Sequence, residues 1–189
     1  MRKVIYAMNV SLDGFIEDPT GAIDWSALDE ELHQFFNDQE YDIDTHLYGR
    51  GMYEIMSDFW PTADLNPSAP AYVVEYARLW KRTPKIVFSR TLEQVGENAM
   101  LVRDNIADEI AKLKAQPGKD MSLGGAGIAA SFMRLDLIDE YQVYIHPIVL
   151  GGGKPMFPEL DAEISLQLAE TRTFGSGVVL LRYRREGTS

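Results

Sequence analysis

The sequence predicts an α/β fold in which helices cover both faces of a mostly parallel sheet and a hairpin adds antiparallel edge strands. Two observations predict this fold. Along residues 4–150, short apolar runs with the length of buried strands alternate with amphipathic segments of helical spacing. Two further strand-like runs, 166–174 and 178–184, flank the turn at 175–177. No repeat or long linker divides the 189 residues, so we expect one domain spanning 1–189.

The first half of the chain predicts strands at residues 4–8, 45–48 and 85–88, with helices between them. The first helix is expected to start near Ser26, because Ser26 and Asp29 together resemble a capping box. Apolar residues at helical spacing define its buried face: Leu28, Leu32, Phe35 and Phe36. A second helix is expected at 52–59, and a third ends near residue 82 after a Pro-rich loop at 61–70.

The second half continues the alternation. Strands are expected at 100–102, 121–123 and 141–150, and helices at 106–115 and from about 126 to 134. Asn105 is a possible cap for the first of these helices. Gly151-Gly152-Gly153-Lys154-Pro155 lacks the pattern of a nucleotide phosphate loop, so we predict a sharp turn with close backbone approach.

Composition excludes several classes of function. The chain has 18 Lys and Arg against 29 Asp and Glu, a net charge of −11, which argues against nucleic acid or an anionic membrane as partner. It contains no Cys, which excludes disulfides, thiolate metal sites and a Cys nucleophile. The three histidines lack metal-ligand spacing, so no metal is expected. No uncharged stretch reaches the length of a membrane span, and we expect a cytoplasmic protein.

The negative charge is concentrated in one segment. Between Asp13 and Asp44 there are eleven acidic residues and no Lys or Arg, whereas the rest of the chain is balanced. These carboxylates either form a solvated surface or include some that face a site. The sequence leaves both interpretations open.

Three predicted strand ends carry residues suited to a nucleotide, and ligands bind beyond the carboxyl ends of strands in open α/β sheets. Gly124-Gly125-Ala126-Gly127 opens a helix, where backbone N–H groups favour a diphosphate. Gly49-Arg50-Gly51 and Ser89-Arg90 follow two other strands and offer guanidinium groups to phosphates. Each signal alone is weak; together they predict separate anchors for the parts of a dinucleotide.

These segments, taken in order, resemble the dihydrofolate reductase superfamily. They resemble more closely the reductase domain that forms the C-terminal part of the bifunctional riboflavin-biosynthesis deaminase-reductase. The resemblance rests on residues 4–15, 47–54, 85–91, 123–125 and 136–157, and it covers nearly the whole chain. It implies a three-layer dihydrofolate reductase-like fold.

The resemblance also implies bound NADPH in an extended form. It assigns the phosphates to Gly49, Arg50, Gly51 and Met52, although family members often carry Thr in place of Met52. It assigns the adenosine 2′-phosphate to Ser89 and Arg90, which favours NADPH over NADH. It assigns the diphosphate and the nicotinamide side of the cofactor to one turn, made by Gly124, Gly125, Ala126, Gly127 and Ile128.

The activity implied is that of an NADPH-dependent reductase of a pyrimidine- or pteridine-type heterocycle, similar to 5-amino-6-(5-phosphoribosylamino)uracil reductase. Dihydrofolate reductase activity and a non-catalytic nucleotide-binding role are the alternatives. Residues 31–35 resemble the family's acid-Leu-x-x-Phe segment, in which the acid contacts the substrate ring. Helical geometry turns Glu30 outward and places Asp29 and Glu31 beside the buried face. We therefore expect Glu31 to be the catalytic acid, with Asp29 second and solvated carboxylates as the alternative.

The resemblance and the loop positions give further expectations about the substrate. Phe15, Trp25 and Phe35 are candidate walls for its ring, and Asp13 either contacts it or tightens its own loop. Thr83 stands near the position where folate-reducing members place an Arg, which weakens dihydrofolate as the substrate. The acidic segment has no cation, so a phosphoribosyl substrate would need its phosphate held from elsewhere, with Lys154 and Arg172 as candidates; this weakens the riboflavin intermediate as the substrate. Related domains pair through sheet-edge and C-terminal elements, so we expect a homodimer.

Overall fold

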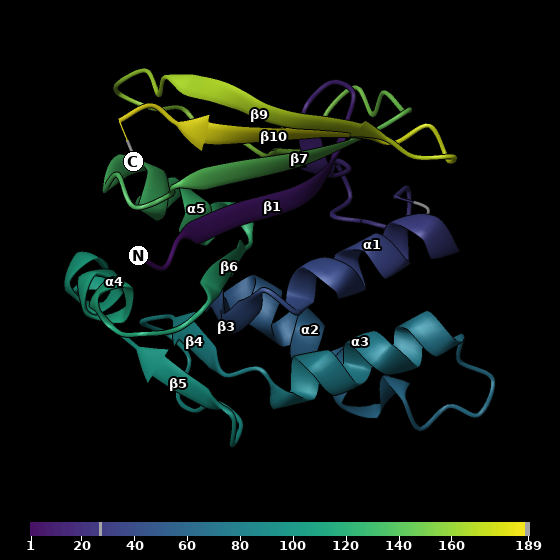
Figure 1. Cartoon of the computed structure of the whole chain (residues 1–189), viewed down its shortest axis with the longest axis horizontal. Coiled ribbons are helices and arrows are strands. Elements are labelled where there is room, and N and C mark those ends of the chain that lie inside the picture. Colours follow the sequence, from purple (N-terminus) through teal and green to yellow (C-terminus); the bar gives the residue numbers. More distant parts are fainter. Residues whose placement is uncertain (27, 188–189) are drawn as a thin grey trace.

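A computed structural model describes residues 1–26 and 28–187 and contains an eight-stranded sheet (Figure 1). The strand order is β5-β4-β3-β6-β1-β7-β10-β9. The first six strands in this order, from β5 to β7, run parallel to one another. Strand β10 pairs antiparallel with β7, and β9 pairs antiparallel with β10, as predicted. The strands are β1 (Val4–Ser11), β3 (Ile43–Gly49), β4 (Lys85–Phe88), β5 (Ala99–Val102), β6 (Asp120–Gly124), β7 (Glu140–His146), β9 (Leu166–Thr173) and β10 (Val179–Arg185).

A two-stranded ribbon, β2 (Phe15–Glu17) with β8 (Lys154–Pro155), lies outside this sheet. Helices α1 (Glu30–Glu40), α2 (Arg50–Ala63) and α3 (Ala71–Arg82) group on one face, and α4 (Ile106–Ala115) and α5 (Ala126–Arg134) on the other (Figure 1). None of the helices in the described parts of the chain has the length and apolar character needed to cross a membrane.

The two faces of the sheet are packed differently because side chains alternate along β1. Val4, Tyr6 and Val10 belong to the larger core cluster, which also contains Ile110 of α4 and Phe132 of α5. The intervening side chains of β1 point toward α1, where a smaller cluster of Leu32, Tyr144, Phe174, Val178 and Leu180 fills only part of the space. The face covered by α1, α2 and α3 therefore retains a cavity.

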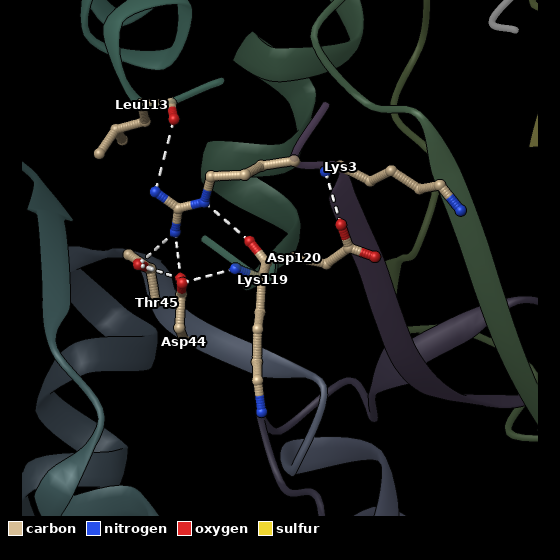
Figure 2. Close-up of polar contacts among 7 residues, drawn as sticks. Lys3, Asp44, Thr45, Leu113, Lys119 and Asp120 are labelled. Atoms are coloured by element: carbon tan, nitrogen blue, oxygen red, sulfur yellow. Dashed lines mark hydrogen bonds and ion pairs between the residues drawn. The ribbon is translucent and has the colours of Figure 1, made fainter. Parts of the chain in front are cut away.

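A buried arginine joins the amino ends of the central strands, and Figure 2 shows Asp44, Thr45 and Lys119 gathered around its guanidinium. Arg2 is 7% exposed and donates to the Lys119 carbonyl at 2.7 Å, to Thr45 Oγ1 at 2.8 Å and to the Asp44 carboxylate. One carboxylate of the acidic segment, that of Asp44, therefore has a structural role in this ion pair and is not directed at a ligand.

Helix α1 begins later than predicted. The Asp29 carboxylate accepts a hydrogen bond from the Leu32 amide at 2.9 Å, so Asp29 is the N-cap residue. The Ser26 hydroxyl instead donates to the Ile23 carbonyl at 2.8 Å. The prediction of a helix from Ser26 is therefore wrong, because that side chain closes the preceding turn.

Helix α2 and strand β7 also end at residues other than those expected, whereas α4 begins where it was predicted to begin. Helix α2 continues through Pro61 to Ala63, where the proline leaves one carbonyl of the helix without its usual N–H donor. Strand β7 ends at His146 because Pro147 cannot donate to a neighbouring strand. Asn105 occupies the cap position of α4 in a left-handed conformation, φ 58°, without a side-chain cap hydrogen bond.

Candidate functional site

A cavity of about 820 Å³ lies between the sheet and helices α1, α2 and α3. It reaches the carboxyl ends of β3 and β6, where the sequence predicted a ligand. Of the eleven acids between Asp13 and Asp44, the described structure brings Glu17, Glu40 and Asp42 to its wall. The acidic segment is thus partly structural and partly directed at the site.

Two helix N-termini lie side by side at the rim of this cavity. Gly49 caps α2 directly after β3, and Gly125 caps α5 directly after β6, the parallel neighbour of β3. Neither cap residue offers a side-chain acceptor to the first helical N–H groups. The two positive helix ends therefore present free donors to one anion, as a diphosphate requires.

Close packing explains the glycines at these turns. A Cβ added at Gly49 would lie 3.1 Å from Cβ of Ile128, and one at Gly124 would lie 3.1 Å from the Tyr48 ring. Gly125 has φ of +103°, which strains any other residue. Met52 packs against the positions of both Gly124 and Gly125, so it serves as a wall of this turn.

A second cavity of about 630 Å³ follows the ends of β4 and β5. It is lined by Ser89 and Arg90, as predicted for one anchor, and it shares Phe88 and Ile128 with the first cavity. The sequence interpretation missed Arg103, which lines the same cavity and donates to the Arg90 carbonyl at 3.3 Å. Its position directly after the predicted strand 100–102 was the available signal.

Arg50 lines the large cavity and reaches the segment that follows β4. Its Nε donates to Glu54 Oε1 at 2.8 Å, and its Nη1 donates to Thr91 Oγ1 at 3.1 Å in the segment after β4. Arg90 is paired with Asp104 at 3.0 Å, with its side chain 81% exposed. The structure therefore brings the three predicted strand ends together along one rim.

Glu31 does not face the cavity, contrary to prediction. Its carboxylate accepts from the Gly175 amide at 2.8 Å and lies 3.8 Å from the Arg172 guanidinium, on the hairpin side of α1. The reason is the orientation of α1, which buries Leu32, His33 and Asn37 and leaves Glu31 exposed. Asp29, the second candidate, is occupied as the helix cap.

Glu40, at the last turn of α1, is the carboxylate that enters the cavity beside a buried histidine. Its side chain is 12% exposed, and its Oε2 lies 2.7 Å from Nε2 of His46, which is 1% exposed. Nδ1 of His46 lies 3.1 Å from the Tyr48 hydroxyl, which accepts from Trp80 Nε1 at 3.2 Å. Burial above all, and Glu40 in addition, raise the pKa of Tyr48, so this hydroxyl keeps its proton.

These contacts link Trp80, Tyr48, His46 and Glu40 in one row of hydrogen bonds. A neutral His46 ring that accepts from the Tyr48 hydroxyl at Nδ1 carries its proton on Nε2, toward Glu40. The spacing of Glu40 and His46 does not mark this pair in the sequence, because one lies on a helix and the other on a strand. The pair forms only when the fold places β3 beside α1.

The predicted ring walls lie elsewhere. Phe15 sits in β2 opposite Pro155, and Phe35 packs against the Tyr144 and Phe174 rings. The Trp25 ring meets His146 edge-on at 5.6 Å. None of these three is among the described residues that line the large cavity; the aromatic rings that line it are Phe36, Tyr48, Phe59, Trp60, Tyr76, Phe88 and Tyr144.

Asp13 tightens its loop, the second of the two roles predicted for it. Its carboxylate accepts from the Ser11 hydroxyl at 2.7 Å and from the amides of Leu150 at 3.0 Å and Gly151 at 2.7 Å. The predicted close approach at 151–155 is confirmed, because a Cβ at Gly153 would lie 1.9 Å from the Glu17 carbonyl. These contacts fasten the β2–β8 ribbon beside the cavity.

We expect Asp13→Asn to lower the melting temperature at neutral pH. The hydrogen bond from Ser11, aided by the amides of Leu150 and Gly151, lowers the pKa of Asp13 below 3.8. A lowered folded-state pKa stabilises above the unfolded pKa, and the contribution is lost as the pH falls through the folded value. Thermal melts should show a difference between wild type and variant that shrinks below pH 3.8. A difference independent of pH would contradict the carboxylate's role.

Comparison with known proteins identifies the family of this chain. The family described as the RibD C-terminal domain matches residues 2–180. The chain is a member of the RibD C-terminal domain family. Its dihydrofolate reductase-like fold and its family agree with the resemblance seen in the sequence.

Members and neighbours of the RibD C-terminal domain family cover this chain almost completely. The uncharacterized protein YyaP of Bacillus subtilis (strain 168) is 40% identical over 187 residues, covering 98% of this chain and 96% of YyaP. A solved Shewanella sp. PV-4 protein, provisionally assigned to riboflavin biosynthesis, has a TM-score of 0.75 at 24% identity, covering 98% of this chain and 99% of that one. Dihydrofolate reductase from Enterococcus faecalis, solved with NADP(H), has a TM-score of 0.65 at 15% identity, covering 97% and 96%.

Proposed function

We propose that this RibD C-terminal domain protein is an NADPH-dependent reductase of a pyrimidine- or pteridine-type heterocycle. The observation that carries the proposal is the pair of uncapped helix N-termini, at Gly49 and Gly125, on the rim of the large cavity. The second cavity supports it, because Arg90 and Arg103 line it where a 2′-phosphate would need cations. The dihydrofolate reductase-like fold agrees with this use of the strand ends.

The residues present fit the cofactor in two parts. The first N–H groups of α2 and α5 would hold the diphosphate, and the close-packed glycines leave room for backbone approach. Ser89, Arg90 and Arg103 would hold the 2′-phosphate in the second cavity. The shared wall of Phe88 and Ile128 makes the two cavities neighbours, as an extended dinucleotide requires. When bound, NADPH supplies the hydride.

Glu40 takes the proton-handling role once assigned to Glu31. Reduction of a ring C=N bond needs a proton on nitrogen as well as a hydride on carbon. Glu40 Oε2 is held by His46, and its Oε1 has no partner among the described residues. A carboxylate hydrogen-bonded to an imidazole inside a cavity can take up a proton and release it to a bound ring. Tyr48 fixes the orientation of His46 and therefore of Glu40.

Oxidation of NADPH in the presence of a panel of oxidised pyrimidines and pteridines tests the proposed function. We expect loss of nicotinamide absorbance with at least one ring, and a much slower reaction with NADH. Binding of NADPH without turnover of any ring would instead favour a non-catalytic nucleotide-binding protein. Failure to bind NADPH would contradict both functions.

Gly127→Ala separates cofactor binding from stability. Gly127 lies in the first turn of α5 on the cavity wall, and an added Cβ would have no atom within 4 Å. Replacing glycine by alanine in a helix is expected to stabilise it by about 0.5–1 kcal/mol. We expect an equal or higher melting temperature but weaker NADPH binding by calorimetry, because the methyl group would occupy the space above the helix end. Unchanged affinity would argue against a diphosphate there.

A further inference from the structure

Among the described residues that line the large cavity, carboxylates outnumber the cations that could hold a phosphate on the substrate. Among the lining residues that the structure describes, Arg50 and Lys154 are the only Lys or Arg side chains. Each faces a carboxylate, Arg50 with Glu54 at 2.8 Å and Lys154 with Glu17 at 3.4 Å. Burial lowers the pKa of His33, the lining histidine, which keeps its ring neutral at physiological pH.

Of the two candidates for holding a substrate phosphate, Lys154 lines the large cavity and Arg172 does not. The Arg172 guanidinium lies over the rings of Phe35, at 4.6 Å, and Phe174, at 4.9 Å. Its Nη2 is 3.8 Å from Glu31, outside the lining of the cavity. The carboxylates of the wall would repel a phosphate, and Arg172, which does not line the cavity, cannot offset this repulsion.

The mouth of the cavity is apolar instead. Four large apolar side chains line it and are still substantially exposed: Ile23 at 49%, Leu28 at 37%, Ile55 at 50% and Phe59 at 55%. They come from the β2–α1 connection and from the cavity side of α2. This surface continues inward to Phe36, Met56 and Trp60. Exposed apolar side chains that continue into a cavity mark a surface that a ligand covers.

Two other walls of the cavity carry polar groups. Glu40 enters from α1, and Gln142 and Tyr144 enter from β7. The Gln142 amide donates to Glu140 at 2.9 Å and accepts from the Tyr144 hydroxyl at 3.0 Å, so its orientation is fixed. Glu40 Oε1 can accept from an N–H group, and a carboxylate in an apolar cavity favours such donors strongly. The cavity thus pairs an N–H-binding wall with an apolar entrance.

We propose that the substrate is an unphosphorylated nitrogen heterocycle that carries an apolar substituent. Its N–H edge contacts Glu40, and its substituent lies against Ile55 and Phe59 of α2. This inference rests on the proposed function, since it names the substrate class of the same cavity. It distinguishes the chain from a reductase of phosphoribosyl intermediates.

Two ligands that share the same heterocyclic ring and differ in its substituent test the inference by calorimetry. One is a 2-amino-4-oxopyrimidine with a phenylethyl substituent, and the other carries a ribosylamino 5′-phosphate on the same ring. We expect the phenylethyl ligand to bind at least about tenfold more tightly, in the presence and absence of NADPH, since burial of an apolar group favours binding. Equal or tighter binding of the phosphorylated ligand, or binding of neither, would overturn the inference.

Variants at the mouth supply the matched controls. Phe59→Ser should weaken the phenylethyl ligand about tenfold and leave the unsubstituted ring unaffected, whereas Leu65→Ser, at a site 73% exposed outside the cavity, should change neither. Ile55→Lys should improve binding of the phosphorylated ligand and weaken the phenylethyl one. An equal loss of affinity for the phenylethyl ligand and for the unsubstituted ring in Phe59→Ser would contradict the inference.

NADPH titrated into the same protein keeps the two proposals distinguishable. Tight phenylethyl binding without NADPH binding supports the substrate class and defeats the reductase. NADPH oxidation with only the phosphorylated ligand does the reverse.

Discussion

Glu40→Gln is expected to lower kcat by about 10²- to 10⁴-fold, the range lost when a positioned acid is removed. Glutamine cannot hold the transferred proton, but its carbonyl can still accept from Nε2 of His46, so the surrounding hydrogen bonds are kept. The Kd for NADPH should stay within about twofold, because Glu40 belongs to neither helix N-terminus and does not line the second cavity. Steady-state turnover together with calorimetric titration measures both quantities.

Glu31→Gln is the control for this variant. It lies on the same helix, but its side chain is 49% exposed and contacts the Gly175 amide. We expect its kcat within about twofold of wild type. A large loss in Glu31→Gln with normal turnover in Glu40→Gln would return the acid to the position that the family resemblance suggested.

Arg90→Ala should weaken NADPH by roughly ten- to hundredfold and leave NADH nearly unchanged. Only NADPH carries the 2′-phosphate, and a hydrogen bond to a charged group contributes about 1.5–3 kcal/mol. The exposed ion pair of Arg90 with Asp104 would oppose binding of the 2′-phosphate only weakly, because surface ion pairs contribute about 0–1 kcal/mol to stability. Titration of both nucleotides into wild type and variant measures the ratio of their affinities.

Arg78→Ala provides the comparison for Arg90. Arg78 is an exposed arginine of α3 that lines neither cavity, so its loss should change neither affinity by more than about twofold. If Arg90→Ala weakened NADPH and NADH equally, the second cavity would not be the 2′-phosphate site.

The fold and the cofactor rim could be predicted because both depend on local patterns. Alternating apolar runs set the strands, and the carboxyl ends of parallel strands meet at one edge, so Gly49, Ser89 and Gly124 had to lie near one another. The ordered motifs then indicated the family. Arg103 was missed although it follows β5 in the same way, because no motif marked it.

The acid could not be predicted because it depends on tertiary packing. The orientation of α1 is set by Asn37, whose amide donates to the Tyr72 carbonyl and to Glu75 of α3, each at 2.9 Å. That contact turns Glu40 inward and Glu31 toward the closing hairpin. The cap at Asp29 also shortened the helix, so Leu28, taken as a core residue, instead lines the mouth of the cavity.

Isothermal titration of the purified chain with NADPH and with NADH tests the central claim most directly. The account predicts one NADPH bound per chain, NADH bound at least about tenfold more weakly, and a loss of this preference in Arg90→Ala. No binding of NADPH at millimolar concentration, or equal affinity for the two nucleotides in wild type, would contradict it.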